Sequence, residues 1–114
     1  MVSLNLRSVN TYHEAQLNAL GDATRRAILA RLLAGPEPVG RLASHFPISR
    51  PAISQHLRIL KDARLVIDRR EGNRRLYELD PDGFASLREY FDRFWDVALA
   101  AFKERVDDHP TQEE

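Results

Sequence analysis

Between residues 50 and 80 the spacing of apolar residues changes from the period of a helix to that of a strand, which limits the folds open to the chain. Residues 50–63 place apolar side chains on one helical face, whereas residues 65–79 form two extended runs. The turn between these runs, at residues 71–73, contains a glycine that can take a positive φ. The chain is therefore predicted to pass from a helix directly into a β-hairpin.

Further helices are predicted on both sides of this segment. Three short runs precede it, at residues 12–20, about 23–34 and 38–46. After the hairpin, Asp80 is a good N-cap and Pro81 fits the first turn of a long helix to about residue 107. Short helices followed by a hairpin form the order of a winged helix-turn-helix, so the predicted fold is mainly α with a small β-hairpin.

The charges are unevenly distributed, although 17 Lys and Arg balance 17 Asp and Glu. Residues 39–79 carry nine basic and four acidic side chains, whereas residues 80–114 carry four basic and ten acidic ones. A basic middle segment and an acidic end suggest that the middle contacts a polyanion from which the end is held away. Chance clustering on a solvated surface is the alternative.

The helix at about 50–63 has a polar face that suits base recognition. Ile53, Leu57 and Leu60 share its apolar face. Ser54, Gln55 and Arg58 lie opposite, near the N-terminal half, which is the part of a recognition helix that meets bases. Gln can pair with adenine and Arg with guanine. Ser49, the expected N-cap, and Arg50 stand at the positive helix end, where a phosphate would bind. The alternative is an ordinary solvated face.

Four arginines surround the hairpin turn: Arg69, Arg70, Arg74 and Arg75. Guanidinium groups this close repel one another, and an anion such as a DNA phosphate would relieve the repulsion. Two or more of the four are therefore expected to contact DNA. The alternative is a surface network in which Asp68, Glu71 and Glu78 pair with some of them.

The last helix carries more aromatic side chains than one exposed helix would bear. Apolar residues at helical spacing form a stripe along one face of this helix. The stripe indicates a homodimer interface formed by Leu87, Phe91, Phe94, Trp95, Ala98 and Phe102, with Tyr12 of the first helix beside it. Two alternatives stay open: packing within one subunit, or a ligand pocket lined by Phe91, Phe94 and Trp95. A dimer would place two recognition helices about 34 Å apart, in successive major grooves.

Several functional classes are excluded by composition. The absence of cysteine removes disulfides, thiolate metal sites and cysteine nucleophiles, and the four histidines form no i, i+4 pair. No nucleophile motif or phosphate-binding glycine loop is present, so neither catalysis nor a cofactor or metal is expected. No apolar run approaches the ~20 residues of a membrane span, and residues 1–10 do not resemble a signal peptide, which favours a cytoplasmic location.

Three separated blocks, at residues 20–29, 49–60 and 65–77, together resemble the ArsR-type family of bacterial winged-helix repressors. This resemblance implies a homodimer that represses transcription from a palindromic operator, with release by a metal or another signal in many members. It further implies that His56 joins Ser49, Arg50, Ser54, Gln55 and Arg58 as a DNA-reading position, and that Arg69–Arg75, with Asn73 at the turn, forms the wing. The chain departs from the family at Arg64, where glycine is usual. A left-handed arginine would cost roughly 1 kcal/mol there.

The combined prediction is a DNA-binding transcriptional regulator without a metal site and with an unknown inducer. One domain is expected over residues 1–108, with a recognition helix at about 50–63, a wing at about 65–79, a dimerisation helix at about 81–107 and a frayed tail at 109–114. The alternatives are a winged-helix module that binds another protein and a regulator with a small-molecule pocket at the C-terminal helix.

Overall fold

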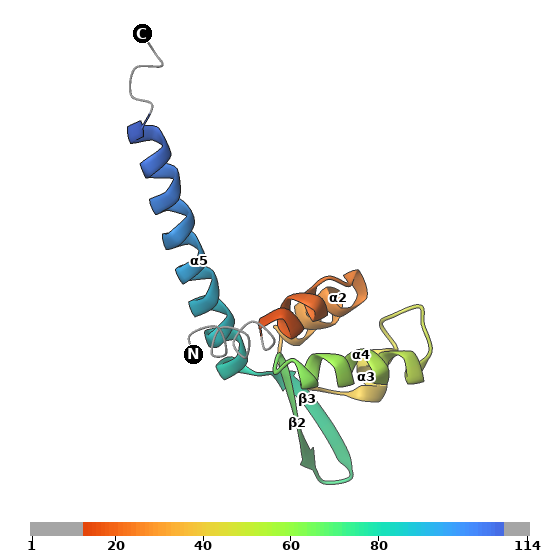
Figure 1. Ribbon diagram of the computed structural model, residues 1–114. Helices are drawn as coiled ribbons and strands as arrows, with labels where there is room; N and C mark the ends of the chain where they lie inside the picture. The colour runs from red at the N-terminus through yellow and green to blue at the C-terminus, as the bar shows by residue number, and fades with distance from the viewer. Residues whose placement is uncertain (1–12, 109–114) are drawn as a thin grey trace.

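The structure, a computed structural model, describes residues 13–108 (Figure 1). Its helices are residues 13–20, α2 (Ala23–Leu32), α3 (Val39–Ala43), α4 (Arg50–Asp62) and α5 (Pro81–Asp108). Its strands are β1 (Glu37–Pro38), β2 (Val66–Glu71) and β3 (Arg74–Leu79). The predicted fold, a mainly helical winged helix-turn-helix with a long last helix, is confirmed.

The strand β1 was not predicted. It pairs antiparallel with β3 through Glu37–Tyr77 and Pro38–Leu76, so the sheet order is β1-β3-β2. Two residues are too few to show the alternation by which a strand is recognised in a sequence. The pairing matters because it places the start of α3, which follows β1 directly, beside the hairpin.

The hairpin of β2 and β3 is closed by two residues rather than the predicted three. Glu71 pairs with Arg74 across the ladder, which leaves only Gly72 and Asn73 in the turn. Gly72 has a φ of 63°, whereas Asn73 does not have a positive φ. This is the arrangement of a type II′ turn, in which glycine occupies the first central position.

One hydrophobic core joins the helices to the base of the hairpin. Its largest fully buried apolar side chains are Ile28, Leu42, Ile53, Leu57, Leu60, Leu65 and Val66. Leu65 and Ile67 do not share one face of a strand, although the first extended run was expected to begin at residue 65, because β2 begins only at Val66 and Ile67 is exposed. Leu65 enters the core from the turn that follows α4.

The start of α5 is held tightly against the rest of the fold. The Asp80 carboxylate accepts from the backbone N–H groups of Asp82 and Gly83, at 3.0 and 3.3 Å. A Cβ at Gly83 would lie 1.5 Å from the carbonyl oxygen of Arg64, so only glycine fits there. Arg64 has a φ of 61°, which confirms the left-handed conformation considered for this position.

The helix at residues 13–20 packs against the same end of α5. The buried Gln16 amide donates to the Gly83 carbonyl oxygen at 3.1 Å, and the His13 ring stacks on Tyr90 with centroids 4.5 Å apart. Beyond Tyr90, α5 projects away from the other helices, whereas the hairpin leaves them in another direction (Figure 1).

Candidate nucleic-acid interface

α4 turns one face to the core and the opposite face to solvent. Ile53, Leu57 and Leu60 are fully buried, and this anchors the rotation of the helix about its own axis. Ser54, Gln55 and Arg58 are all exposed on the other side. The three residues predicted to read bases therefore form one accessible surface, which we call the reading face.

The start of α4 has the expected cap. The Ser49 hydroxyl accepts from the backbone N–H of Ala52 at 3.2 Å, and Pro51 lies in the first turn, where its missing N–H costs nothing. Arg50, the first helical residue, is exposed. Ser49 thus fixes the helix end, and Arg50 carries a positive charge to it.

His56 lies apart from the reading face. It is half-buried, and its Nδ1 lies 3.3 Å from Nη1 of Arg25 on α2. The same arginine donates from Nε to the Ala19 carbonyl oxygen at 2.8 Å. His56 therefore belongs to the contact between α2 and α4, on the flank of the recognition helix.

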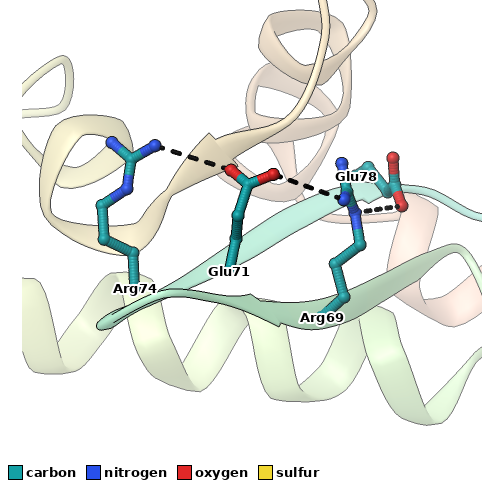
Figure 2. A network of polar contacts seen from close by, with 4 residues as sticks. All are labelled: Arg69, Glu71, Arg74 and Glu78. Atoms are coloured by element: carbon teal, nitrogen blue, oxygen red, sulfur yellow. Dashed lines mark hydrogen bonds and ion pairs between the residues drawn. The ribbon is translucent and has the colours of Figure 1, made fainter.

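Carboxylates pair with the wing arginines on one face of the hairpin. Figure 2 shows Glu71 between Arg69 and Arg74, with Glu78 on the other side of Arg69. Nε of Arg69 donates to Glu78 at 3.2 Å, and the guanidinium groups of Arg69 and Arg74 lie 3.8 and 3.7 Å from Glu71. The surface network left open as an alternative is thus present. Arg69, Glu71 and Arg74 each still expose about half or more of their side chain to solvent, and Glu78 exposes 28%.

Asp68 connects the wing to the recognition helix. Lys61 of α4 places Nζ 2.8 Å from one carboxylate oxygen, Arg75 of β3 donates to the other, and the Asp68 side chain is only 7% exposed. The hydrogen bond from Lys61 holds the pKa of the Asp68 carboxyl below its ordinary value; Arg75 acts in the same direction, and burial opposes both. This ion pair fixes the wing relative to the end of α4.

Arg70 differs from the other wing arginines. It is exposed, and within residues 13–108 it forms no ion pair. It stands directly opposite Arg75 on the ladder, where like charges destabilise a strand pair. A bound anion would reduce this repulsion.

Arg41 was missed by the sequence reasoning. It lines a groove together with Arg50 of α4 and with Arg74 and Arg75 of the wing. A single arginine on a five-residue helix shows no pattern, and its neighbours are set by the pairing of β1 with β3. Basic side chains that are far apart in sequence therefore line one groove between the start of α4 and the wing.

The projecting half of α5 exposes apolar side chains. Trp95 is 57% and Phe102 63% exposed, Phe91 and Phe94 are also exposed, and Ala98 is partly buried. Leu87 differs from this group, because it is 6% exposed and packs in the core of its own chain; it presents little surface to a partner, and its place in a dimer interface stays a prediction. Tyr12, assigned to the same interface, lies outside the described residues.

An apolar groove of about 590 Å³ opens between α2, the end of β3 and the start of α5. Its walls include Leu20, Leu29, Ala30, Leu33, Leu79 and Phe84. The pocket considered from the sequence was lined by Phe91, Phe94 and Trp95, and none of these contributes to this groove. Phe84 lies on the same helical face as Phe91 and Trp95, so the groove continues the exposed stripe of α5.

Residues 13–108 offer neither a metal-binding cluster nor a membrane-spanning helix. No cluster of three or more His, Cys, Asp or Glu side chains in this range could hold a metal ion. None of the helices in it has the length and hydropathy needed to cross a membrane.

Comparisons with known proteins agree with the fold. The model of the family "Bacterial regulatory protein, arsR family" matches residues 22–68, the part that contains α2 to α4. HTH-type transcriptional regulator Rv2034 of Mycobacterium tuberculosis is 57% identical over 89 residues, which cover 78% of this chain and 83% of that protein. Transcriptional repressor SdpR of Bacillus subtilis is 47% identical over 62 residues, which cover 54% of this chain and 69% of that protein.

A solved structure of an ArsR-like regulator has the same fold as this chain. The ArsR-like transcriptional regulator from Rhodococcus sp. RHA1 superposes with a TM-score of 0.74 at 29% identity, over 85% of this chain and 94% of that one. The helix-turn-helix match, the 57% identity to a regulator and the shared winged fold agree with one another. The chain therefore belongs to the arsR family of bacterial regulatory proteins.

Proposed function

We propose that this protein is a non-catalytic, cytoplasmic repressor of transcription that binds a palindromic operator as a homodimer. The observation that carries the proposal is the reading face, where Ser54, Gln55 and Arg58 are exposed on a helix whose opposite side is buried. Side chains of these types recognise base edges in the major groove. The wing supplies further arginines beside them for the phosphate backbone.

The charge distribution supports the same orientation. The acidic residues 80–114 belong mostly to α5, which projects away from the other helices in a direction different from that of the hairpin (Figure 1). Phosphates held at α4 and the wing are thereby kept away from the acidic residues on the projecting part of α5.

The exposed stripe of α5 supports the homodimer. A single chain leaves Phe94, Trp95 and Phe102 in water, so the favourable free energy of burying these large aromatic surfaces is not realised. A symmetric copy of the chain offers an equally apolar surface to cover them. Repression is proposed because SdpR, a relative at 47% identity, is named a transcriptional repressor.

Selection of bound sequences from a pool of random duplexes tests the proposal. Two inverted half-sites about 10 bp apart, centre to centre, are expected, because this spacing brings two recognition helices to one side of the DNA. Salt-independent binding, or no enrichment of any sequence, would contradict the proposal and favour a module that binds an acidic protein.

The dimer is tested by introducing single cysteines into this cysteine-free chain. Ala98→Cys lies on the exposed apolar stripe, and Ala100→Cys, its matched control, lies on the opposite side of α5. A maleimide should label position 98 more slowly at micromolar concentration, where the dimer covers the stripe, than after dilution, whereas position 100 should react at the same rate in both cases. A rate at position 98 that does not depend on protein concentration, with a monomer mass in sedimentation, would contradict the homodimer.

A further inference from the structure

A second basic surface lies beside the wing turn, separate from the reading face. It is a groove of about 410 Å³ bounded by the start of α3, the start of α4 and the hairpin turn. Four arginines line it, and no acidic side chain does; the arginines are Arg41, Arg50, Arg74 and Arg75. Three separate elements therefore contribute positive charge to one concave site.

Only part of this charge is neutralised within the chain. Arg75 is paired with Asp68, and Arg74 lies 3.7 Å from Glu71, which it shares with Arg69. Arg41 and Arg50 form no ion pair with any residue in the described range 13–108. The groove thus keeps at least two uncompensated guanidinium groups.

The backbone holds these groups together. Pairing of Pro38 with Leu76 sets the first turn of α3 beside the hairpin. The guanidinium of Arg50 lies against Gly40 of α3, since a Cβ at Gly40 would be 3.7 Å from its Nη1. Because the same ladder and core fix all three elements, the backbone positions that carry the arginines stay close together, and an anion between their guanidinium groups is favoured.

We propose that this groove binds a phosphate of the DNA backbone and that Arg41 supplies the charge that neutralises it. The inference rests on the proposed function and adds a contact that reads no base. A phosphodiester offers two anionic oxygens to guanidinium groups, which bind phosphate in a bidentate manner. Arg41 then contributes to affinity for every duplex and nothing to the choice of sequence.

The test measures the salt dependence of binding to a random-sequence duplex by the wild type and by Arg41→Ala. Each neutralised phosphate contributes about 0.9 to the magnitude of the slope of log K against log salt. When one phosphate contact is lost, the decrease in affinity between 50 and 200 mM salt is therefore about 3.5-fold smaller. Arg41→Ala should lower the slope by about 0.9, Arg41→Lys should restore it, and preference for the operator should stay unchanged.

Two controls separate the explanations. Arg93→Ala removes one exposed charge from the projecting part of α5 and should leave the slope unchanged. A titration with inorganic phosphate alone separates a DNA contact from a site for a free phosphate ligand. Saturable phosphate binding that Arg41→Ala abolishes, with no change in the DNA slope, would overturn the assignment to DNA.

The outcomes also distinguish this inference from the proposed function. If the wild type binds its operator and Arg41→Ala keeps the full slope, the groove is not a phosphate site although the regulator function stands. If the wild type binds no duplex at all, the proposed function fails first. A circular dichroism spectrum identical to that of the wild type shows that Arg41→Ala is folded. A lower slope of log K against log salt then means that the contact between Arg41 and a DNA phosphate has been lost.

Discussion

Replacing Asp68 with asparagine removes a charge that two cations share between α4 and the wing. Its carboxylate receives Lys61 on one oxygen and Arg75 on the other, and its side chain is 7% exposed. A hydrogen bond to a charged group contributes about 1.5–3 kcal/mol, but both cations are about half exposed, so the pair is worth less than the sum. We expect Asp68→Asn to lower the free energy of unfolding by about 1–2 kcal/mol at pH 7.

The pH dependence sharpens this prediction. The pKa of Asp68 is lowered in the folded protein from an ordinary value of 3.8, so its stabilisation is fully present above about pH 4 and is lost as the pH falls through the folded pKa. The difference between wild type and Asp68→Asn should therefore shrink as the pH is lowered below about 4.

Urea unfolding at fixed protein concentration, repeated from pH 7 to pH 3, measures this difference. Asp62→Asn is the matched control, because Asp62 is exposed at the end of α4, next to Lys61, and has no ion pair within the described part of the chain. It should change stability by less than about 0.5 kcal/mol at every pH. An Asp68→Asn protein as stable as the wild type at pH 7, or a difference that does not vary with pH, would refute the reasoning.

Three further substitutions test other parts of the structure. Arg64→Gly should raise the free energy of unfolding by up to about 1 kcal/mol in urea, since glycine adopts a φ of 61° without strain; a loss of stability would contradict this. Gly83→Ala should lower it by about 3 kcal/mol, because the new Cβ would lie 1.5 Å from the Arg64 oxygen, and an unchanged unfolding curve would show that α5 can shift. Glu71→Gln should strengthen binding to random duplex DNA and steepen its salt dependence, because Arg69 and Arg74 lose a shared carboxylate; equal slopes would show that both arginines stay away from DNA.

Much of the fold could be predicted from the sequence because its elements carry local signals. The i, i+4, i+7 spacing of Ile53, Leu57 and Leu60 predicted the buried face of α4, and the structure confirms it. Ser49 and Asp80 marked the starts of α4 and α5 correctly through the capping preference of their side chains.

Features that depend on pairing between distant segments could not be predicted. β1 exists only because Glu37 and Pro38 meet β3, and Arg41 reaches the wing only through that pairing. Likewise, the choice of Asp68 as the partner of Arg75 depends on the register of the hairpin and on the position of Lys61. The contact of His56 with Arg25 depends on how α2 crosses α4, which no local pattern records.

The central claim is that the exposed side chains of α4 select the DNA sequence. The most direct measurement is the affinity of Gln55→Ala and Arg58→Ala for the selected operator and for random duplex DNA at one salt concentration. Each substitution should cost roughly 1–3 kcal/mol on the operator and little on random DNA. Folded variants that keep the full ratio between the two affinities would contradict the claim.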